Sequence, residues 1–267
     1  MARTAQQVAA YLAYRAPATY AAAAAVFRQV ALQRPDWAPR SLLDAGAGPG
    51  VAAWAAREAW PSLARLTLLE VEPEMVAAGR ELLPEADWVQ ADVAAARGPA
   101  DLVLASYVLG ELADPAAAAA RLWEQAADTL ALVEPGTPEG YRRVLAARAA
   151  VLHAGGHTVA PCPHDLPCPL PEDDWCHFAV RLPRSKLHRR AKGVELGYED
   201  EKFSYAVLSR ERVAPATARI IRAPQSRSGH VNLVLSEADG SVRVRTVAKR
   251  EGPAYRQARK AAWGDPF

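Results

Sequence analysis

The chain has 267 residues, of which 51% are hydrophobic and 23% are charged, and this composition excludes a disordered protein. No apolar run reaches the roughly 18 to 20 residues that a membrane span requires, so neither an integral membrane protein nor a membrane partner is expected. The N-terminus lacks the basic start and apolar block of a secretory signal, and we therefore expect a cytoplasmic location.

The net charge of +2 conceals opposite charges in the two parts of the chain. Residues 177–267 contain 19 Lys and Arg against 9 Asp and Glu, whereas residues 1–176 contain 13 basic and 21 acidic residues. A basic region of this size is typical of proteins that bind a polyanion such as RNA. The alternative is a solvated basic face without a ligand.

Residues 1–40 are predicted to form a helical extension. Three apolar residues are spaced for one helix face, namely Val8, Tyr11 and Leu12. The Ala-rich stretch at 20–32 also favours a helix, and Pro35 and Pro39 end it.

Residues 41–155 alternate between short strands and helices. The predicted strands are 42–43, 66–70, 88–90, 101–106 and 129–134. The predicted helices are 54–60, 73–83, 115–128 and 141–154. Such alternation predicts an α/β fold with a mostly parallel, Rossmann-like sheet that is covered by helices on both faces.

Beyond residue 155 the composition changes again. A segment rich in Pro, Cys and Asp at 156–176 precedes β-like runs and a basic helix candidate, at 203–208, 218–221, 230–235, 242–247 and 255–263. Asp239-Gly240 predicts a hairpin turn between the last two runs. These late strands either complete the main sheet or form a small β subdomain. The expected division is 1–40 as extension, 41–155 as core, and 156–267 as a cysteine-bearing, basic region.

The first chemical motif is Asp-Ala-Gly-Ala-Gly-Pro-Gly at residues 44–50, between a predicted strand and a predicted helix. The glycines allow a tight turn and a close approach of the backbone to a ligand. Glu70 ends the next strand, where an acid can bind ribose hydroxyls, and Asp92 follows the third strand. The loop lacks the G-x-G-x-x-G spacing of dinucleotide-binding enzymes and the GK[ST] sequence of a P-loop. A NAD-type or non-binding Rossmann fold is the alternative.

This set of residues resembles the class I S-adenosylmethionine-dependent methyltransferases over about residues 41–155. The resemblance implies that the cofactor residues are Asp44, Gly46, Gly48, Gly50, Glu70 and Asp92. In that family the glycine loop holds the methionine part, the acid after strand two holds the ribose, and an acid after strand three meets the adenine amine. Glu72 competes with Glu70, which is preferred because it closes the apolar strand.

The sequence does not identify a catalytic residue. The segment after strand four, 106–111, reads Ser-Tyr-Val-Leu-Gly-Glu and lacks the D/N-P-P-Y/F motif that related enzymes use on base amino groups. Methyl transfer depends mainly on alignment and exclusion of water, so few side chains are required. Tyr107 and Glu111 could face the acceptor; alternatively, Glu111 is simply exposed near the start of a helix.

All three cysteines lie within fifteen residues, with the spacing C-x5-C-x7-C: Cys162, Cys168 and Cys176. Thiolates are the ligands of iron–sulfur clusters and of structural zinc. The C-x2–4-C element that is usual in zinc sites is missing, and the wide spacing suits a group larger than one ion. His164 and His177 are nearby candidate ligands. Three unrelated thiols are the alternative.

Almost the whole chain also resembles a methyltransferase-like family that is associated with the small ribosomal subunit in bacteria and mitochondria. The most specific matches are the segment from Cys162 to Phe178 and the EDEKFSY segment at 199–205. The resemblance implies that the three cysteines bind a [4Fe–4S] cluster, with zinc as the alternative. Ser236 stands where the family has a fourth cysteine. Either Ser236 or a His completes the site, an outside ligand does so, or the cluster is labile or absent.

Together these observations predict an S-adenosylmethionine-binding, iron–sulfur protein that acts on or binds small-subunit ribosomal RNA in ribosome assembly or translation, and no DNA partner is expected. One alternative is a non-catalytic assembly factor in which the cofactor fold and cluster are structural. Another is a methyltransferase of small molecules whose basic face is incidental.

Overall fold

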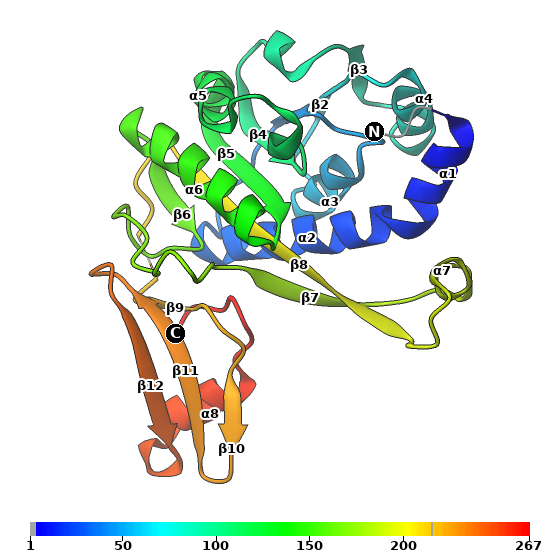
Figure 1. Cartoon of the computed structure of the whole chain (residues 1–267). Coiled ribbons are helices and arrows are strands. Elements are labelled where there is room, and N and C mark those ends of the chain that lie inside the picture. The colour runs from blue at the N-terminus through cyan, green and yellow to red at the C-terminus, as the bar shows by residue number, and fades with distance from the viewer. Residues whose placement is uncertain (1–3, 215) are drawn as a thin grey trace.

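A computed structural model describes residues 4–214 and 216–267, except for the side chains of 187, 191 and 192. Its centre is an eight-stranded sheet (Figure 1). The strands are β1 Ser41–Ala45, β2 Arg65–Glu70, β3 Asp87–Gln90, β4 Ala100–Ser106, β5 Ala126–Pro135, β6 His157–Ala160, β7 Phe178–Pro183 and β8 Tyr198–Ser209. Their order is β3-β2-β1-β4-β5-β8-β6, and β7 pairs with β8 off this path.

Helices cover both faces of the sheet, and the predicted α/β class with a Rossmann-like core is confirmed. The helices are α1 Ala5–Tyr14, α2 Ala16–Gln33, α3 Val51–Ala59, α4 Pro73–Leu82, α5 Pro115–Gln125, α6 Pro138–His153, α7 Lys186–Lys192 and α8 Pro253–Lys260. Alternate residues of each buried strand face opposite sides. Leu42 packs in the core formed with α2 and α3, whereas its neighbour Leu43 packs with α5 and α6.

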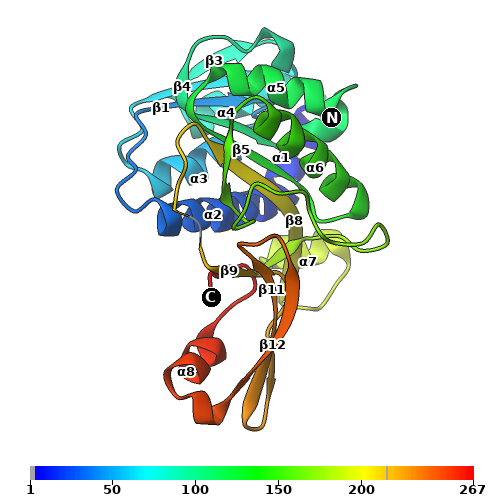
Figure 2. The ribbon, with the colours of Figure 1, turned by 90° about the vertical axis from the view of Figure 1, so that its left-hand side faces the viewer.

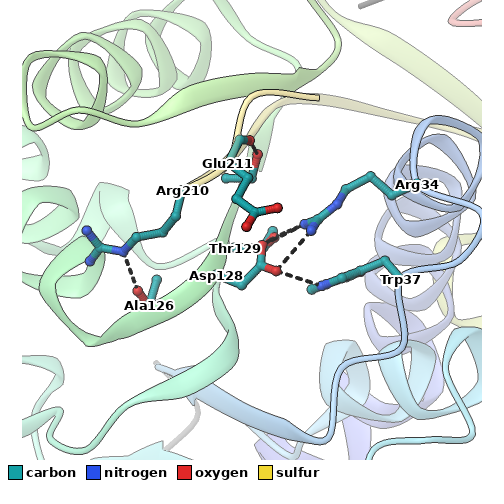
Figure 3. A network of polar contacts seen from close by, with 8 residues as sticks. Arg34, Trp37, Ala126, Asp128, Thr129, Arg210 and Glu211 are labelled. Carbon is teal, nitrogen blue, oxygen red and sulfur yellow. Dashed lines mark hydrogen bonds and ion pairs between the residues drawn. The ribbon is translucent and has the colours of Figure 1, made fainter. Parts of the chain in front are cut away.

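The predicted N-terminal extension contributes side chains to the hydrophobic core, because α2 lies against the sheet. Its Phe27 is fully buried there. Arg34, just past α2, donates to both carboxylate oxygens of Asp128 in β5 at 2.7 and 2.9 Å, and Trp37 donates to the same carboxylate at 3.0 Å (Figure 3). Arg210 at the end of β8 donates to the carbonyl of Ala126. These contacts join the extension to the start of β5, and the start of β5 to the residue that follows β8.

The sequence left open whether the late strands complete the main sheet or form a small β subdomain, and the structure shows both. Strand β8 enters the main sheet between β5 and β6, antiparallel to both, while its first half pairs with β7. Four further strands form a second, antiparallel sheet below it (Figure 2). They are β9 Ala218–Ile220, β10 Gln225–Arg227, β11 His230–Glu237 and β12 Val242–Ala248.

The second sheet has a small core of its own, formed with α8 around Val231, Leu233 and Ala258. The predicted hairpin turn joins β11 to β12, where Gly240 adopts φ +82°. None of the helices in the described ranges, 4–214 and 216–267, has the length and apolar character that crossing a membrane requires.

The order of the parallel strands reverses between β1 and β4. In open α/β sheets the connections that follow the two strands beside such a reversal run to opposite faces of the sheet, and ligands bind in the crevice that this leaves outside the carboxyl ends of the strands. The topology therefore places a candidate site beyond the ends of β1, β2 and β4, where the glycine loop lies.

Candidate functional site

A cavity of about 410 Å³ opens at the reversal point. Residues from the ends of β1, β2, β3 and β4 line it, together with residues from α1 and α2. Five of the six residues predicted to hold the cofactor lie on its wall: Asp44, Gly46, Gly48, Glu70 and Asp92. Glu72, the competitor of Glu70, also lines it.

The glycine loop is held in shape by its backbone. The amides of Gly46 and Ala47 both donate to the carbonyl of Leu69 in β2, at 2.9 and 2.8 Å. Gly46 has φ +78°, and a Cβ atom there would lie 2.4 Å from Cγ2 of Val108. The sixth predicted residue, Gly50, does not line the cavity. It packs against Leu68 so closely that a Cβ atom would lie 2.9 Å from that side chain.

Asp44 is the most unusual group in this cavity. The side chain is 1% exposed, and neither carboxylate oxygen has a hydrogen-bond partner among the residues that the structure describes. Burial and the nearby charge of Glu70 together raise the pKa of Asp44 to about 7, against a lowering effect of the nearby backbone amide of Ala53. A buried carboxylate without a partner is costly, so this site favours a cationic ligand.

The other two acids are tied to the backbone. One oxygen of Glu70 accepts from the amide of Gly48 at 2.8 Å, and the other accepts from the amide of Glu72 at 2.8 Å. Glu70 thus joins the glycine loop to the turn after β2. Asp92 is exposed and accepts from the amide of Ala94 at 2.8 Å. Both carboxylates keep lone pairs that can accept hydroxyl or amino groups of a ligand.

A cluster on the cavity wall was missed by the sequence analysis. Arg15, between α1 and α2, donates to both carboxylate oxygens of Glu201 in β8, at 2.9 and 2.8 Å. The hydroxyl of Tyr107 donates to Glu201 at 2.8 Å, and the Arg15 guanidinium lies 4.7 Å from the centre of the Tyr107 ring. Burial raises the pKa of Tyr107, which keeps the donating proton in place. No local pattern links residues 15 and 201, although Glu201 belongs to the EDEKFSY segment.

Two other acids lie near this wall. Glu111 lines the cavity beside Tyr107. Glu134 of β5 is 1% exposed and accepts from the amide of Leu109 at 2.9 Å, and burial raises its pKa to about 7. Glu134 thus holds the turn that follows β4.

The three cysteines converge on a second cavity, which Ser236 also lines. Residues 161–177 carry them and contain no helix or strand. The hydroxyl of Tyr141 lies 3.0 Å from Sγ of Cys168, and burial raises the pKa of the Cys162 and Cys176 thiols. His164 Nε2 lies 3.5 Å from Oγ of Ser236.

His177, the other candidate ligand, stacks on Trp175 at a centroid distance of 5.6 Å and is not on the wall of the cysteine cavity. No group of three or more His, Cys, Asp or Glu side chains in the described part of the chain is arranged to hold a metal ion. The cysteines therefore share a cavity, but their geometry gives no support to a metal site.

Two buried arginines hold the cysteine loop. Arg219 is 1% exposed and donates to the carbonyls of Pro161 and Gly264, at 2.8 and 2.9 Å, and to the amide oxygen of Gln29. Arg148 is 4% exposed and donates to the carbonyls of His164 and Leu166, at 2.6 and 3.1 Å.

Neither Arg148 nor Arg219 has a carboxylate within 4.0 Å among the described residues. Both charges lower the pKa of Cys162, against the effect of burial. A buried cation without a counter-ion is costly, so the surroundings of the cysteines favour an anion.

Comparisons with known proteins identify the family of this chain and some of its relatives. The sequence model of the family described as "Mitochondrial small ribosomal subunit Rsm22" matches residues 5–267. The human ribosome assembly protein METTL17, mitochondrial, is 29% identical over 292 residues, which cover 96% of this chain and 61% of that protein. Rsm22-cox11 tandem protein 2, mitochondrial, of Schizosaccharomyces pombe is 27% identical over 329 residues, covering 98% of this chain and 43% of that protein.

Among solved structures, a putative RNA methyltransferase from Pyrococcus horikoshii aligns with a TM-score of 0.47 and 16% identity, over 70% of this chain and 81% of that one. The chain spans about three fifths of the length of the human relative and less than half of the fission yeast relative.

The predicted cytoplasmic location is wrong, because the matching family and both of these relatives are described as mitochondrial. The prediction rested on the lack of a basic start and an apolar block, which distinguishes secreted proteins from others. That pattern does not separate the compartments inside a cell from one another.

Proposed function

The chain belongs to the Rsm22 family of the mitochondrial small ribosomal subunit, and on this premise we propose that it is an S-adenosylmethionine-binding factor that binds small-subunit ribosomal RNA during ribosome assembly. The observation that carries the cofactor is the buried carboxylate of Asp44, which has no partner among the described residues and lies in a glycine-lined cavity at the reversal point of the sheet.

S-adenosylmethionine is cationic at its sulfonium and ammonium groups, and it supplies an electrophilic methyl group when bound. Asp44 would offset this positive charge, and the loop with Gly46 and Gly48 would lie along the methionine part. Glu70 would accept from the ribose hydroxyls, and Asp92 would accept from the adenine amine. In this proposal residues 1–40 pack on the core and 41–155 hold the cofactor, while 156–267 carry the cysteines and the basic surface.

Calorimetry with S-adenosylmethionine tests the cofactor directly. We expect the wild type to bind and Gly48→Arg to lose binding, because the larger side chain fills the loop; a Cβ atom at Gly48 meets only the Tyr11 hydroxyl, at 4.0 Å. Absence of heat from the wild type would refute the cofactor proposal. If Gly48→Arg retains its association with small-subunit RNA, the two functions are separable.

The RNA partner is supported by the charge of residues 177–267 and by the family. Methyl transfer to RNA is one use of the bound cofactor, and it can be measured with S-adenosylmethionine labelled in its methyl group. A structural use is favoured by the Arg15–Glu201 pair and the Tyr107 hydroxyl, which close one wall of the cavity. Label in the RNA decides for catalysis, and binding without label decides for the structural use.

We also propose that the cysteine cavity holds an iron–sulfur cluster, with zinc as the alternative metal. This proposal rests on charge: three thiols share one cavity, and Arg148 and Arg219 lie beside it without a carboxylate partner among the described residues. A cluster held by thiolates is anionic and would compensate both cations. Cys162, Cys168 and Cys176 would be its ligands, and Ser236 lines the same cavity.

Iron, zinc and acid-labile sulfide contents of anaerobically purified protein test this proposal. We expect iron and sulfide in similar amounts, with the broad visible absorption of thiolate-bound iron. Cys176→Ser is expected to lose the metal, whereas Ser236→Cys is expected to raise its occupancy because thiolate is a softer ligand than a hydroxyl. Protein with no metal under these conditions would refute the proposal, and one zinc without iron would replace the cluster by a structural zinc.

A further inference from the structure

A third cavity, of about 360 Å³, lies next to the proposed cofactor pocket. The two cavities share one lining residue, Arg15. The wall between them is the Arg15–Glu201 pair, to which the Tyr107 hydroxyl also donates. A ligand in this third cavity is therefore separated from the cofactor pocket by the Arg15–Glu201 ion pair.

The sides of this third cavity carry exposed aromatic and aliphatic groups. Tyr14, the last residue of α1, is 40% exposed, and Tyr198, the first residue of β8, is 38% exposed. Leu196 is 53% exposed on the same wall. Large apolar groups scattered singly over a surface require no explanation, but three around one cavity mark a candidate ligand-binding surface.

Fixed polar groups complete the lining. Arg184 donates to Glu199 at 3.2 Å, and Arg15 donates to Glu201 at 2.8 Å. Asp200 lines the same cavity and accepts from Arg181 at 2.7 Å, so all three carboxylates have defined orientations. The guanidinium of Arg181 lies 4.0 Å from the centre of the Tyr198 ring. Rings for stacking beside oriented donors and acceptors are what proteins use to read an unstacked nucleic-acid base.

A basic groove adjoins this cavity. A depression of about 480 Å³ is lined by three cations of α7, Lys186, Arg189 and Arg190, and by one acid, Glu195, with Gly193 and Val194. Arg189 and Arg190 form no ion pair with any residue in the described ranges. Helix α7 lies at the end of the β7–β8 hairpin and contacts α1, which carries Tyr14 (Figure 1). Unpaired cations at this place suit the phosphates of a strand whose base enters the cavity.

We propose that the cavity between Tyr14 and Tyr198 binds one unpaired base of an RNA strand, and that α7 binds the adjoining phosphates. This inference rests on the proposed RNA-binding function and assigns the residues that carry it out. Among polyanions a flexible RNA strand fits best, because a base has a flat face for the two rings and polar edges for the oriented carboxylates and guanidinium groups. A duplex would present no free base to this cavity.

The test uses a single-stranded RNA that carries 2-aminopurine, whose fluorescence falls when the base stacks. With the full-length wild type we expect binding and quenching. Tyr198→Leu is expected to bind on the order of tenfold more weakly and to lose the quenching, whereas Tyr198→Phe keeps the ring and both signals. Tyr14→Leu is the second variant, in case the first does not fold, and calorimetry with S-adenosylmethionine reports on folding.

Arg189→Glu with Arg190→Glu separates phosphate contacts from the base. This double variant is expected to bind more weakly with a shallower salt dependence, while saturating RNA is still quenched. If Tyr198→Leu and Tyr14→Leu both bind RNA and quench 2-aminopurine as the wild type does, the base site is overturned and the proposed function stands. No RNA binding by the wild type would overturn both.

Discussion

The cofactor pocket and the cysteine cavity contain buried charges of opposite sign. In the pocket, Asp44 has no hydrogen-bond partner or cation among the described residues. Beside the cysteines, Arg148 and Arg219 donate to carbonyls and have no carboxylate partner in the same ranges. Since an uncompensated buried charge is costly, the first site is suited to a cation and the second to an anion.

The two regions also differ in how they are built. The pocket is formed by backbone turns at the ends of parallel strands, where glycines adopt positive φ angles. The cysteine loop, residues 161–177, has no regular structure and depends on side chains that reach its carbonyls. The pocket is therefore preformed by the fold, whereas the cavity depends on a few side chains. The following substitutions test this difference.

The largest effect is expected at the glycine loop. Gly46→Ala places a Cβ atom 2.4 Å from Val108 at a φ of +78°, so backbone strain and overpacking add. We expect the free energy of unfolding to fall by about 4 kcal/mol, as measured in urea, together with loss of S-adenosylmethionine binding.

Gly155→Ala is the matched control, because Gly155 has φ +83° but a Cβ atom there meets nothing within 4 Å. Backbone strain alone predicts a loss of about 1 kcal/mol with cofactor binding intact. Equal effects of the two substitutions would contradict the view that the close approach to Val108 shapes the pocket.

A smaller effect is expected at the cysteine cavity. Arg219→Met leaves two carbonyls and the Gln29 amide oxygen buried without their donor, so we expect a loss of about 3 kcal/mol in urea unfolding and lower metal content. Arg28→Met is the control. Arg28 is 61% exposed and forms an ion pair with Asp265 at 3.7 Å. Its loss is expected to change the free energy of unfolding by less than about 1 kcal/mol. An effect of Arg219→Met no larger than this control would show that the loop does not depend on the buried arginine.

The smallest effect concerns pH. Because the pKa of Asp44 is raised to about 7, the folded protein retains a proton that the unfolded chain releases at its usual, lower pKa. The free energy of unfolding should then fall as pH rises, by about 2 kcal/mol more between pH 5 and 6.5 in the wild type than in Asp44→Asn. Glu134 titrates in both proteins, so its contribution cancels in the difference.

Saturating S-adenosylmethionine sharpens this test, since a cationic ligand favours the ionised carboxylate. It should reduce the pH difference between the wild type and Asp44→Asn in urea unfolding. A difference that persists at saturation would mean that the ligand does not meet Asp44.

Much of the fold could be predicted from local patterns. The alternation of short apolar strands and helices over 41–155 predicted the parallel part of the sheet, and Asp239-Gly240 predicted the hairpin between β11 and β12. The position of β8 could not be predicted. Its insertion between β5 and β6 depends on pairing across about 50 to 80 residues, which leaves no periodic signal in the strand itself. The predicted run at 203–208 is only the buried half of that strand.

The site was predictable where one loop carries the chemistry. The glycines, Glu70 and Asp92 follow strand ends, and parallel strands bring those ends together. The Arg15–Glu201–Tyr107 cluster joins three distant segments through side chains, so no spacing rule could identify it. The buried arginines show a similar limit. Nothing near Arg148 or Arg219 in the sequence indicates that each is buried beside the cysteines.

Strand β8 connects the regions that this comparison separates. Glu201 accepts from Arg15 and Tyr107, which line the cofactor pocket, and three residues later the hydroxyl of Ser204 donates to the carbonyl of Cys176 at 2.8 Å. Both contacts depend on the register of one strand between β5 and β7. Any coupling between the two sites would be reciprocal, because each ligand must then change the affinity for the other by the same factor. Strand β8 is thus the structural link between two sites that share no lining residue among those described.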